Sequence, residues 1–406
     1  MAVVVAATTV VAAMAVVQML EKAFHGSRRY YIWMGVLALF IIIGLIAYFR
    51  QLNYGLGITG MSRDVPWGLY IAQFTFLVGV AASGVMVVIP YYLHNFKAFG
   101  KIVILGEFLA VASVCMAMLF VLVDLGQPAR VLNVLLYPTP NSVMFWDICV
   151  LASYLLLNII IGWTVLGAEK KGFPPPRWAK VLILISIPLA ISIHTVTAFL
   201  YAGLPGKDYW LSAIMAARFL SSAFASGPAL LLLIGLIIRR LTSFKVSNES
   251  VDALTKIVCY AMIANVFFFL LELFTAFYSG IPGHQSSLLY LFVGLDGHGN
   301  LMPFMWTAAI LALVGIVLLL IPKLRRNLKV LPVALASVFF ACWLDKGVAL
   351  VLAGFVPNSF ERITEYIPTL NEIMVICGIY ALGLFILSVL FKVVIAVRAS
   401  SEVDEH

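Results

Sequence analysis

The chain has 406 residues, of which 63% are hydrophobic and only 11% are charged, and its formal net charge is +8. This composition excludes an ordinary soluble domain, in which about half of the residues are apolar and about a quarter are charged. The basic residues cluster at the ends of apolar runs. The positive charge therefore indicates membrane topology, and we expect a lipid bilayer and no nucleic acid as a partner.

Apolar runs of about 20 residues recur along the whole chain, and this is the length that a helix needs to cross a bilayer. We therefore expect an all-α polytopic membrane protein with ten transmembrane helices. The predicted spans cover residues 31–50, 66–94, 101–125, 143–168, 178–202, 211–240, 251–279, 302–322, 330–355 and 369–397.

The spans are expected to form two four-helix bundles followed by two additional helices. Residues 1–18 lack the basic region of a signal peptide. They are consistent with an extra helix, a peripheral segment or an upstream extension. The predicted division is 1–30 as an N-terminal segment, 31–168 as the first bundle with the functional site, 178–322 as the second bundle, 330–398 as the two C-terminal helices and 399–406 as a tail.

The connections between the spans differ on the two sides of the membrane. Alternation of ten spans places 19 of the 26 basic residues on one side. The positive-inside rule makes this side cytoplasmic, with both ends of the chain on it. The outer connections, such as 126–142 and 280–301, are long and rich in Gly, Pro and aromatic residues. Long loops on one face predict that a partner docks there.

Two carboxylates lie where the third and fourth spans meet the outer interface, and ionisable groups at such a depth are costly and usually functional. Asp147 is also suited to stabilising the start of its helix. Asp124 ends its helix, where a negative charge opposes the helix dipole, so it should attract a cation. Arg130 and Arg218 are the candidates on the same side.

Aromatic and histidine side chains occur near the same interface. Trp67 and Tyr70 at the start of the second span fit either an aromatic belt or a wall that stacks on a flat ring. His194 is the one histidine well inside a span, and it fits either a buried structural role or a quinone or proton ligand. No second histidine lies at a matching depth, which argues against a haem held by two histidines. The five cysteines form no CxxC pair, so no cysteine-ligated iron–sulfur cluster or zinc is indicated.

Further charged residues lie inside the later spans. Arg218 and Glu272 could pair, and Asp345 with its neighbour Lys346 should each find a partner on another helix. Glu107 lies toward the cytoplasmic end of the third span. The pattern suits proton exchange with a site open to the outer face, and it would equally suit an ion transporter.

Several motifs together resemble the signature of the NrfD/PsrC family, the membrane subunits of polysulfide-reductase-like respiratory complexes. The ten-span length and the segment from His194 to Gly206 are similar to the longer members, found in the sulfite-reduction-associated complex of sulfate reducers. The motifs are Asp124-Leu-Gly-Gln-Pro-Ala-Arg130, Pro138-Thr-Pro-Asn-Ser142, Met144-Phe-Trp146 and Trp67-Gly-Leu-Tyr70.

The resemblance implies a protein of the prokaryotic cytoplasmic membrane that works in anaerobic respiration and sulfur metabolism. It implies a bound menaquinone near the outer face and no haem or iron–sulfur cluster held by this polypeptide itself. It also implies a ferredoxin-like iron–sulfur subunit on the outer face, together with cytochrome and further membrane subunits.

The combined hypothesis is a menaquinone-binding subunit of a redox complex, with proton translocation as a further expectation. The alternative is a secondary transporter or ion-translocating module without redox chemistry. In the main hypothesis, Asp147 and His194 contact the quinone and exchange protons, and Asp124 with Arg130 or Arg218 orients them. The walls are Trp67, Tyr70 and Trp146, and the proton-path candidates are Glu272, Glu107 and Asp345.

Overall fold

A computed structural model describes residues 21, 23, 25–242, 244 and 246–404. The interpretation of residues 1–18 lies outside these residues. In the described part of the chain the regular elements are helices, and no β-strand is formed. Among the described residues, ten helices are long and apolar enough to cross a membrane. The predicted all-α polytopic membrane fold is thereby confirmed.

The ten candidate membrane spans agree with the predicted boundaries to within four residues at each end, and the last helix continues beyond its span to Asp404. Some spans are continuous helices and two are built from several segments. They are α2 (Arg28–Tyr54), α3–α4–η3 (Leu69–Val80, Ser83–Val88, Ile89–Leu93), α5 (Gly100–Asp124), α7 (Val143–Lys170), α8 (Arg177–Ala202), α9 (Met215–Leu241), α10 (Asn248–Tyr278), α12 (Met302–Leu320), α14–η7–α15 (Leu331–Cys342, Trp343–Ala349, Leu350–Ala353) and α16 (Leu370–Asp404).

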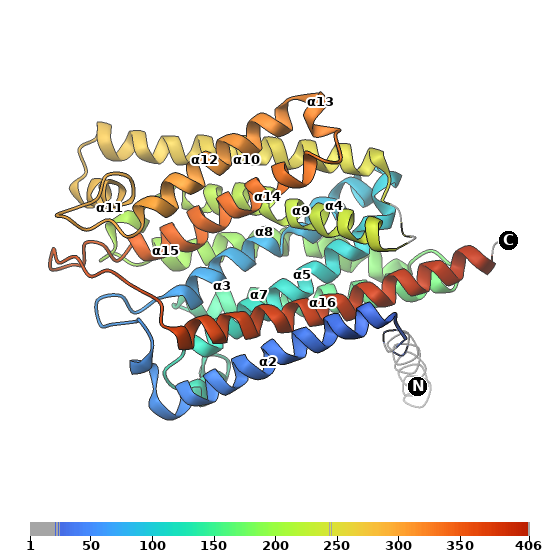
Figure 1. The fold of residues 1–406 in the computed structure, drawn as a ribbon, viewed down its shortest axis with the longest axis horizontal. Helices are drawn as coiled ribbons and strands as arrows, with labels where there is room; N and C mark the ends of the chain where they lie inside the picture. Colours follow the sequence, from blue (N-terminus) through green and yellow to red (C-terminus); the bar gives the residue numbers. More distant parts are fainter. Residues whose placement is uncertain (1–20, 22, 24, 243, 245, 405–406) are drawn as a thin grey trace.

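The spans differ strongly in how deeply they are buried. The α3–α4–η3, α5 and α14–η7–α15 spans are enclosed by other helices, whereas α2 leaves most of its surface facing outward. In Figure 1, α2 and α16 lie side by side along one edge of the molecule. Their close approach depends on glycine, because a Cβ atom on Gly44 would come within 2.6 Å of the Gly378 Cα.

Helices that are distant in sequence share one packing unit. The last helix, α16, packs against α2, α5 and α7, so it joins the predicted first bundle. The α14–η7–α15 span packs between α3, α9 and α12. Both C-terminal spans thus pack against helices of the predicted bundles, and the division into bundles stays a prediction.

Two spans contain π-helical turns, which are rare and often lie at functional sites. One is η3, and the other is η7, which carries Asp345 and Lys346. The extra residue per turn shifts which side chains face the centre of the molecule. In η7, Lys346 is only 4% exposed, while its neighbour Asp345 is partly buried.

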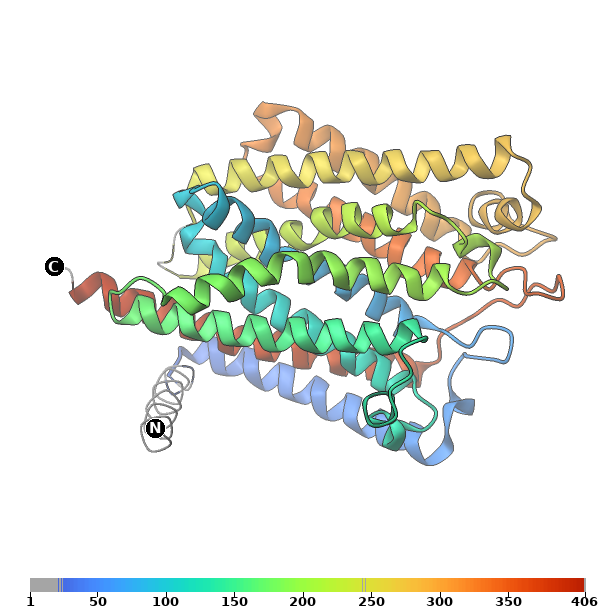
Figure 2. The same ribbon diagram turned by 180° about the vertical axis from the view of Figure 1, so that it is seen from behind.

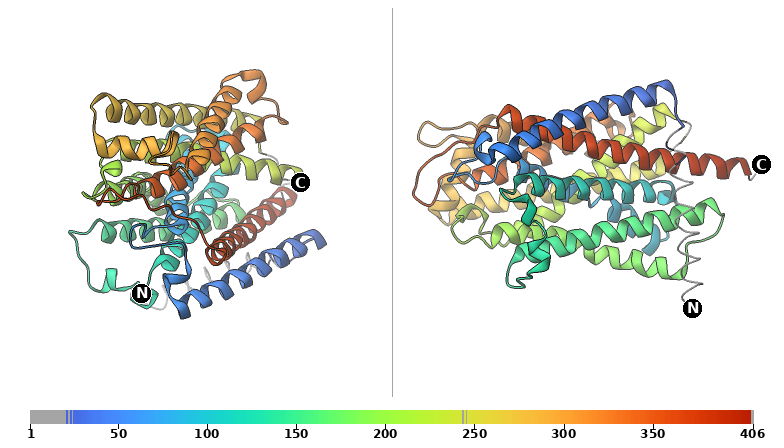
Figure 3. Two further views of the ribbon diagram at one scale, coloured as in Figure 1. Left: turned by 60° about the vertical axis from the view of Figure 1, so that its left-hand side comes forward. Right: turned by 90° about the horizontal axis from the view of Figure 1, so that it is seen from below.

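The long connections gather at one end of the molecule, at the left in Figure 1 and seen from two further directions in Figure 3. We call this the loop-rich end. It contains five connections, with short helices inside them: residues 55–68 with η2 (Leu56–Ile58), 125–142 with η5 (Pro128–Arg130) and α6 (Asn133–Leu136), 203–214 with η6 (Asp208–Trp210), 279–301 with α11 (Pro282–Phe292), and 354–369.

Glu372, in the first turn of α16, holds two of these connections together. Its carboxylate accepts hydrogen bonds from the Gly60 N–H and the Thr369 N–H, each at 2.7 Å. The Tyr366 hydroxyl donates a third at 2.7 Å and accepts one from the Leu69 N–H at 3.0 Å. The start of α3 is thus fixed relative to the last helix.

Candidate functional site

Asp147 is buried near the start of α7 and is bound by a residue of the next helix. The Thr197 hydroxyl lies 2.7 Å from its Oδ1 atom and also 2.7 Å from the Ile193 carbonyl oxygen. The helices α7 and α8 that carry these residues lie side by side on the face shown in Figure 2. A hydroxyl has one proton and can also accept. Thr197 can therefore donate to an ionised Asp147, or accept from a protonated Asp147 while donating to the carbonyl.

The buried polar face of α8 continues in both directions from Thr197. One turn earlier lies His194, which is fully buried and whose two ring nitrogens have no hydrogen-bond partner among the described residues. One turn later lies Tyr201, whose hydroxyl forms a short hydrogen bond with Thr75 of α3. We call Asp147, Thr197, His194, Tyr201 and Thr75 the Asp147 cluster.

An aromatic group covers the Asp147 cluster toward the loop-rich end. The Trp67 ring stacks on Trp210 with centroids 5.7 Å apart and meets Tyr201 edge-on at 5.5 Å. Phe355 closes the group, with its ring centroid 5.1 Å from that of Trp210. We call Trp67, Trp210, Tyr201 and Phe355 the Trp67 stack. Tyr201 belongs to both groups and connects the polar cluster to the aromatic one.

Asp124 lies at the end of α5, and its Oδ1 atom is buried without a hydrogen-bond partner in the described chain. The prediction that Asp124 pairs with Arg130 or Arg218 is wrong. Arg130 is exposed in a connection, and Arg218 is bound to other carboxylates.

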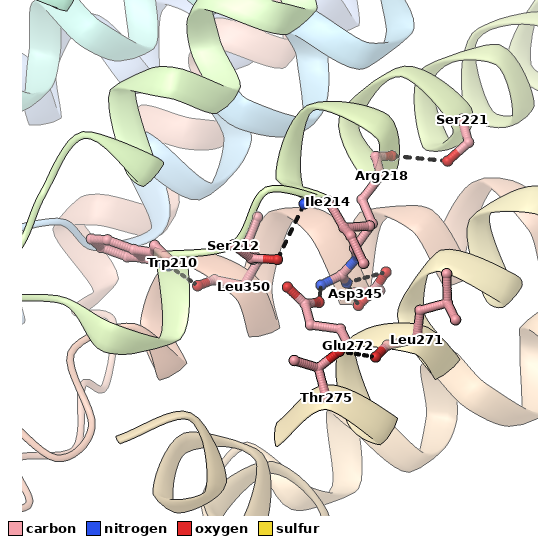
Figure 4. Close-up of polar contacts among 10 residues, drawn as sticks. All are labelled: Trp210, Ser212, Ile214, Arg218, Ser221, Leu271, Glu272, Thr275, Asp345 and Leu350. Atoms are coloured by element: carbon pink, nitrogen blue, oxygen red, sulfur yellow. Dashed lines mark hydrogen bonds and ion pairs between the residues drawn. The ribbon is translucent and has the colours of Figure 1, made fainter. Parts of the chain in front are cut away.

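A second polar group lies between α9, α10 and η7, and Figure 4 shows three of its residues, Arg218, Glu272 and Asp345. Arg218 contacts Glu272, as the sequence predicted. Its Nη2 atom also donates to both carboxylate oxygens of Asp345, at 3.0 and 3.2 Å. Asp345 thus finds its partner on another helix, which was also expected. We call Arg218, Glu272, Asp345 and Lys346 the Arg218 cluster.

Lys346 makes no ion pair within the part of the chain that the structure describes. Its Nζ atom lies 4.2 Å from the Phe219 ring centroid and 3.4 Å from the Phe219 carbonyl oxygen. The Phe219 ring also lies 5.8 Å from that of Tyr201. Phe219 therefore connects the Arg218 cluster to the Asp147 cluster.

The remaining predicted residues lie farther from these clusters or in other roles. The Tyr70 hydroxyl donates to Gln51 at 2.8 Å, and this bond ties α3 to α2. Trp146 is half exposed, and its indole N–H donates to the Pro140 carbonyl at 2.8 Å. Glu107 is buried 17 residues before Asp124 on α5, which is about 25 Å along the helix.

Sequence reasoning missed Thr197, Tyr201 and Trp210, and it expected a partner on another helix for Lys346 without identifying it. Two of them had a signal, because His194, Thr197 and Tyr201 recur at helical spacing and form one polar face in an otherwise apolar span. No sequence signal pointed to Trp210, since it lies in a connection between spans. Lys346 was noted as a charge within a span, but its position in a π-helical turn could not be read from hydropathy.

The family model for NrfD, described as polysulphide reductase, matches residues 57–394. The chain belongs to this family. That finding confirms the resemblance drawn from the motifs around Asp124 and Trp67.

Named relatives of this NrfD-family protein belong to reductases and a menaquinol oxidoreductase. It is 27% identical over 397 residues to a putative dimethyl sulfoxide reductase membrane subunit of Halobacterium salinarum, with 87% of this protein and 88% of the relative covered. It is 23% identical over 405 residues to the Hdr-like menaquinol oxidoreductase integral membrane subunit of Archaeoglobus fulgidus, with 95% and 99% covered. A polysulfide reductase polypeptide of Wolinella succinogenes is 26% identical over 192 residues, with 43% and 60% covered.

Proposed function

We propose that this protein is the menaquinone-binding membrane subunit of a respiratory reductase complex. In this proposal it exchanges electrons with an iron–sulfur subunit docked on the loop-rich end. The observation that carries the proposal is the Asp147 cluster, a buried group of ionisable and hydroxyl side chains directly beneath the Trp67 stack. The menaquinol and reductase names of the relatives support it.

The residues present fit a quinone. Buried polar atoms normally have partners, so an unpartnered one indicates a missing ligand or water. Asp124 Oδ1 and both ring nitrogens of His194 are such atoms, and they come from α5 and α8, which both pack against α3, α7 and α9. Asp147 and His194 would hold the quinone oxygens, and Trp67 would contact the ring. When bound, menaquinone supplies reversible two-electron chemistry that takes up or releases two protons.

The proton is handled by the protein's own residues. Asp147 accepts or gives a proton, and Thr197 stabilises either state because its hydroxyl can donate or accept. The apolar helices around the cluster exclude water, which strengthens these interactions. Glu272 and Asp345 are proposed to carry protons onward, and Phe219 contacts both clusters between them.

The proposed location is the prokaryotic cytoplasmic membrane, with both ends of the chain in the cytoplasm. The distribution of basic residues supports this orientation. Connections at the end opposite the loop-rich end carry Lys170 and Lys171 after α7 and Arg239 and Arg240 at the end of α9. The loop-rich end would then face outward, toward the redox partner.

The test is quinol-driven electron transfer in the intact complex carrying Asp147→Asn. Loss of a proton-transfer group typically lowers turnover by about 100-fold or more. Glu249→Gln makes the same kind of change, from carboxylate to amide, at an exposed position of the opposite end of the molecule and should leave turnover unchanged. Unchanged turnover in Asp147→Asn would remove this residue from the site.

The alternative is an ion-translocating module without redox chemistry, and the buried charges of the Arg218 cluster favour it specifically. Purification in mild detergent separates the two functions. Co-purified iron–sulfur or cytochrome subunits with extractable quinone support the redox subunit. A solitary polypeptide that contains neither, and that moves ions in vesicles, supports the alternative.

A further inference from the structure

A groove of about 250 Å³ lies between α10 and α12, at a distance from the Asp147 cluster. Its volume is near the lower end of the roughly 300–1,000 Å³ of small-molecule sites. Leu270 and Leu313 line it and are 54% and 65% exposed, so its mouth opens on the surface that faces lipid. A ligand can therefore enter the groove sideways from the membrane.

Small side chains on α12 create the space. Ala308, Ala309 and Ala312 face the groove, where larger residues would fill it. Toward the loop-rich end, Phe292 of α11 closes the groove, with its ring centroid 6.0 Å from that of Phe269. The groove is thus a slot that is open to lipid on one side and closed toward the loops.

The groove is apolar except for two polar side chains, Asn265 and Asp345. Asn265 is 97% buried, and its Oδ1 atom has no partner in the described chain. Asp345 also lines the groove while its carboxylate binds Arg218. An unpaired polar atom in an apolar wall costs free energy, which a ligand with a hydroxyl group would recover.

The depth of Asn265 limits which lipid can supply that hydroxyl. It lies 17 residues after the start of α10 and 13 before its end, about 25 Å and 20 Å along the helix. This is close to the middle of the membrane. Phospholipid head groups remain at the surface, and acyl chains carry no donor. A lipid-soluble quinol has its hydroxyl groups on a ring that can lie within the apolar layer.

We propose that the groove between α10 and α12 binds a second lipid-soluble quinol, whose hydroxyl donates a hydrogen bond to Asn265. The ring lies against the alanines of α12, and the tail leaves past Leu270 and Leu313 into the lipid. The inference rests on the proposed function, since it invokes the same class of redox lipid. The site is separate from the Asp147 cluster, because its residues come from α10, α11, α12 and the α14–η7 span, and it shares only Asp345 with the Arg218 cluster.

The test uses a photoreactive azidoquinol added to membranes that contain the whole complex, followed by mapping of the labelled peptides. Label is expected within 262–273 of α10 or 305–316 of α12. Ala309→Phe fills the groove and should lower this labelling at least about tenfold. Ile310→Phe adds a similar ring on the same helix outside the groove and should leave labelling unchanged.

Asn265→Leu tests the hydrogen bond itself. Loss of one net hydrogen bond corresponds to about tenfold weaker apparent binding at this site. Thermal unfolding of each variant verifies that it is folded, so a loss of label can be assigned to the groove.

Two outcomes overturn the inference and leave the proposed function intact. In the first, the azidoquinol labels α7 or α8 but neither α10 nor α12. In the second, a photoreactive phospholipid labels the groove and quinol does not displace it. An absence of label on α7, α8, α10 and α12 together, with no quinol-driven turnover, would overturn the proposed function as well. Groove label that Ala309→Phe removes and Asp147→Asn leaves in place supports a second site.

Discussion

Thr197 lies 2.7 Å from the buried carboxylate of Asp147 and connects α8 to α7. If this hydroxyl serves both protonation states of Asp147, Thr197→Val should lower quinol-driven turnover about tenfold, the effect of one net hydrogen bond. Thr197→Ser keeps the hydroxyl and should stay near the parent rate. Equal losses in the two variants would assign the effect to packing instead.

Arg218 is the central cation of a buried ion cluster, so its removal should destabilise the fold. Arg218→Met leaves Glu272 and Asp345 without their counter-ion, and breaking a buried ion pair in this way costs about 3–5 kcal/mol. Denaturation of the purified protein in detergent measures the loss. Arg130→Met removes an exposed cation and should be neutral. A parent-like unfolding midpoint for Arg218→Met would contradict the cluster as described.

Glu372 joins the connections 55–68 and 354–369, so Glu372→Gln should loosen the loop-rich end. The amide nitrogen cannot accept the hydrogen bonds that one carboxylate oxygen now receives from Gly60 and Thr369. Hydrogen exchange of residues 55–68 should accelerate about tenfold, equivalent to the loss of about 1.4 kcal/mol of local stability. Glu361→Gln at an exposed position of the same end serves as the control.

Hydropathy predicted the ten spans because each must be apolar over the thickness of a bilayer, a local property of the sequence. It could not predict that α16 packs between α2 and α5, since such contacts depend on which helix surfaces fit. Gly44 and Gly378 illustrate the limit: each is an ordinary small residue in its own span, and only together do they allow the close approach.

The candidate site likewise has features that the sequence predicted and features that it could not predict. The pairing of Arg218 with Glu272 followed from two opposite charges at similar depth in neighbouring spans, and it is present. The partner of Asp147 is an uncharged threonine, one of many in the chain, and charge counting could not identify it. Asp124 and Arg130 are six residues apart, yet the turn after α5 leaves Arg130 exposed.

Glu365 gives the connection 293–301 a pH-dependent anchor outside the membrane spans. Burial alone would raise the pKa of this carboxyl, but hydrogen bonds from the Asn300 N–H, Tyr290 and His298 outweigh it and hold the pKa below its ordinary value. A lowered folded-state pKa stabilises the fold above the unfolded value of about 4.3. This stability is lost as the pH falls through the folded-state pKa.

Hydrogen exchange of residues 293–301, corrected for the intrinsic pH effect, should therefore accelerate as the pH falls from 7 to about 3.5, across the ordinary carboxyl pKa. Glu365→Gln should show faster exchange at pH 7 and little further change on acidification. A variant that keeps the parent's pH dependence would place the anchor on another group.

Lys346 is a buried cation without a carboxylate partner in the described chain, held by the Phe219 ring and carbonyl oxygen. Burial of an unpaired charge costs free energy, so Lys346→Met, of similar length, should unfold at the parent's denaturant concentration or higher. If the charge serves proton movement between the Asp147 and Arg218 clusters, the same variant should lose quinol-driven turnover while staying folded. Lys323→Met, at an exposed position, should change neither quantity. A large loss of stability in Lys346→Met would instead show that the lysine balances the charge of Asp345. In the variant, the Asp345 carboxylate would then lack part of its counter-charge.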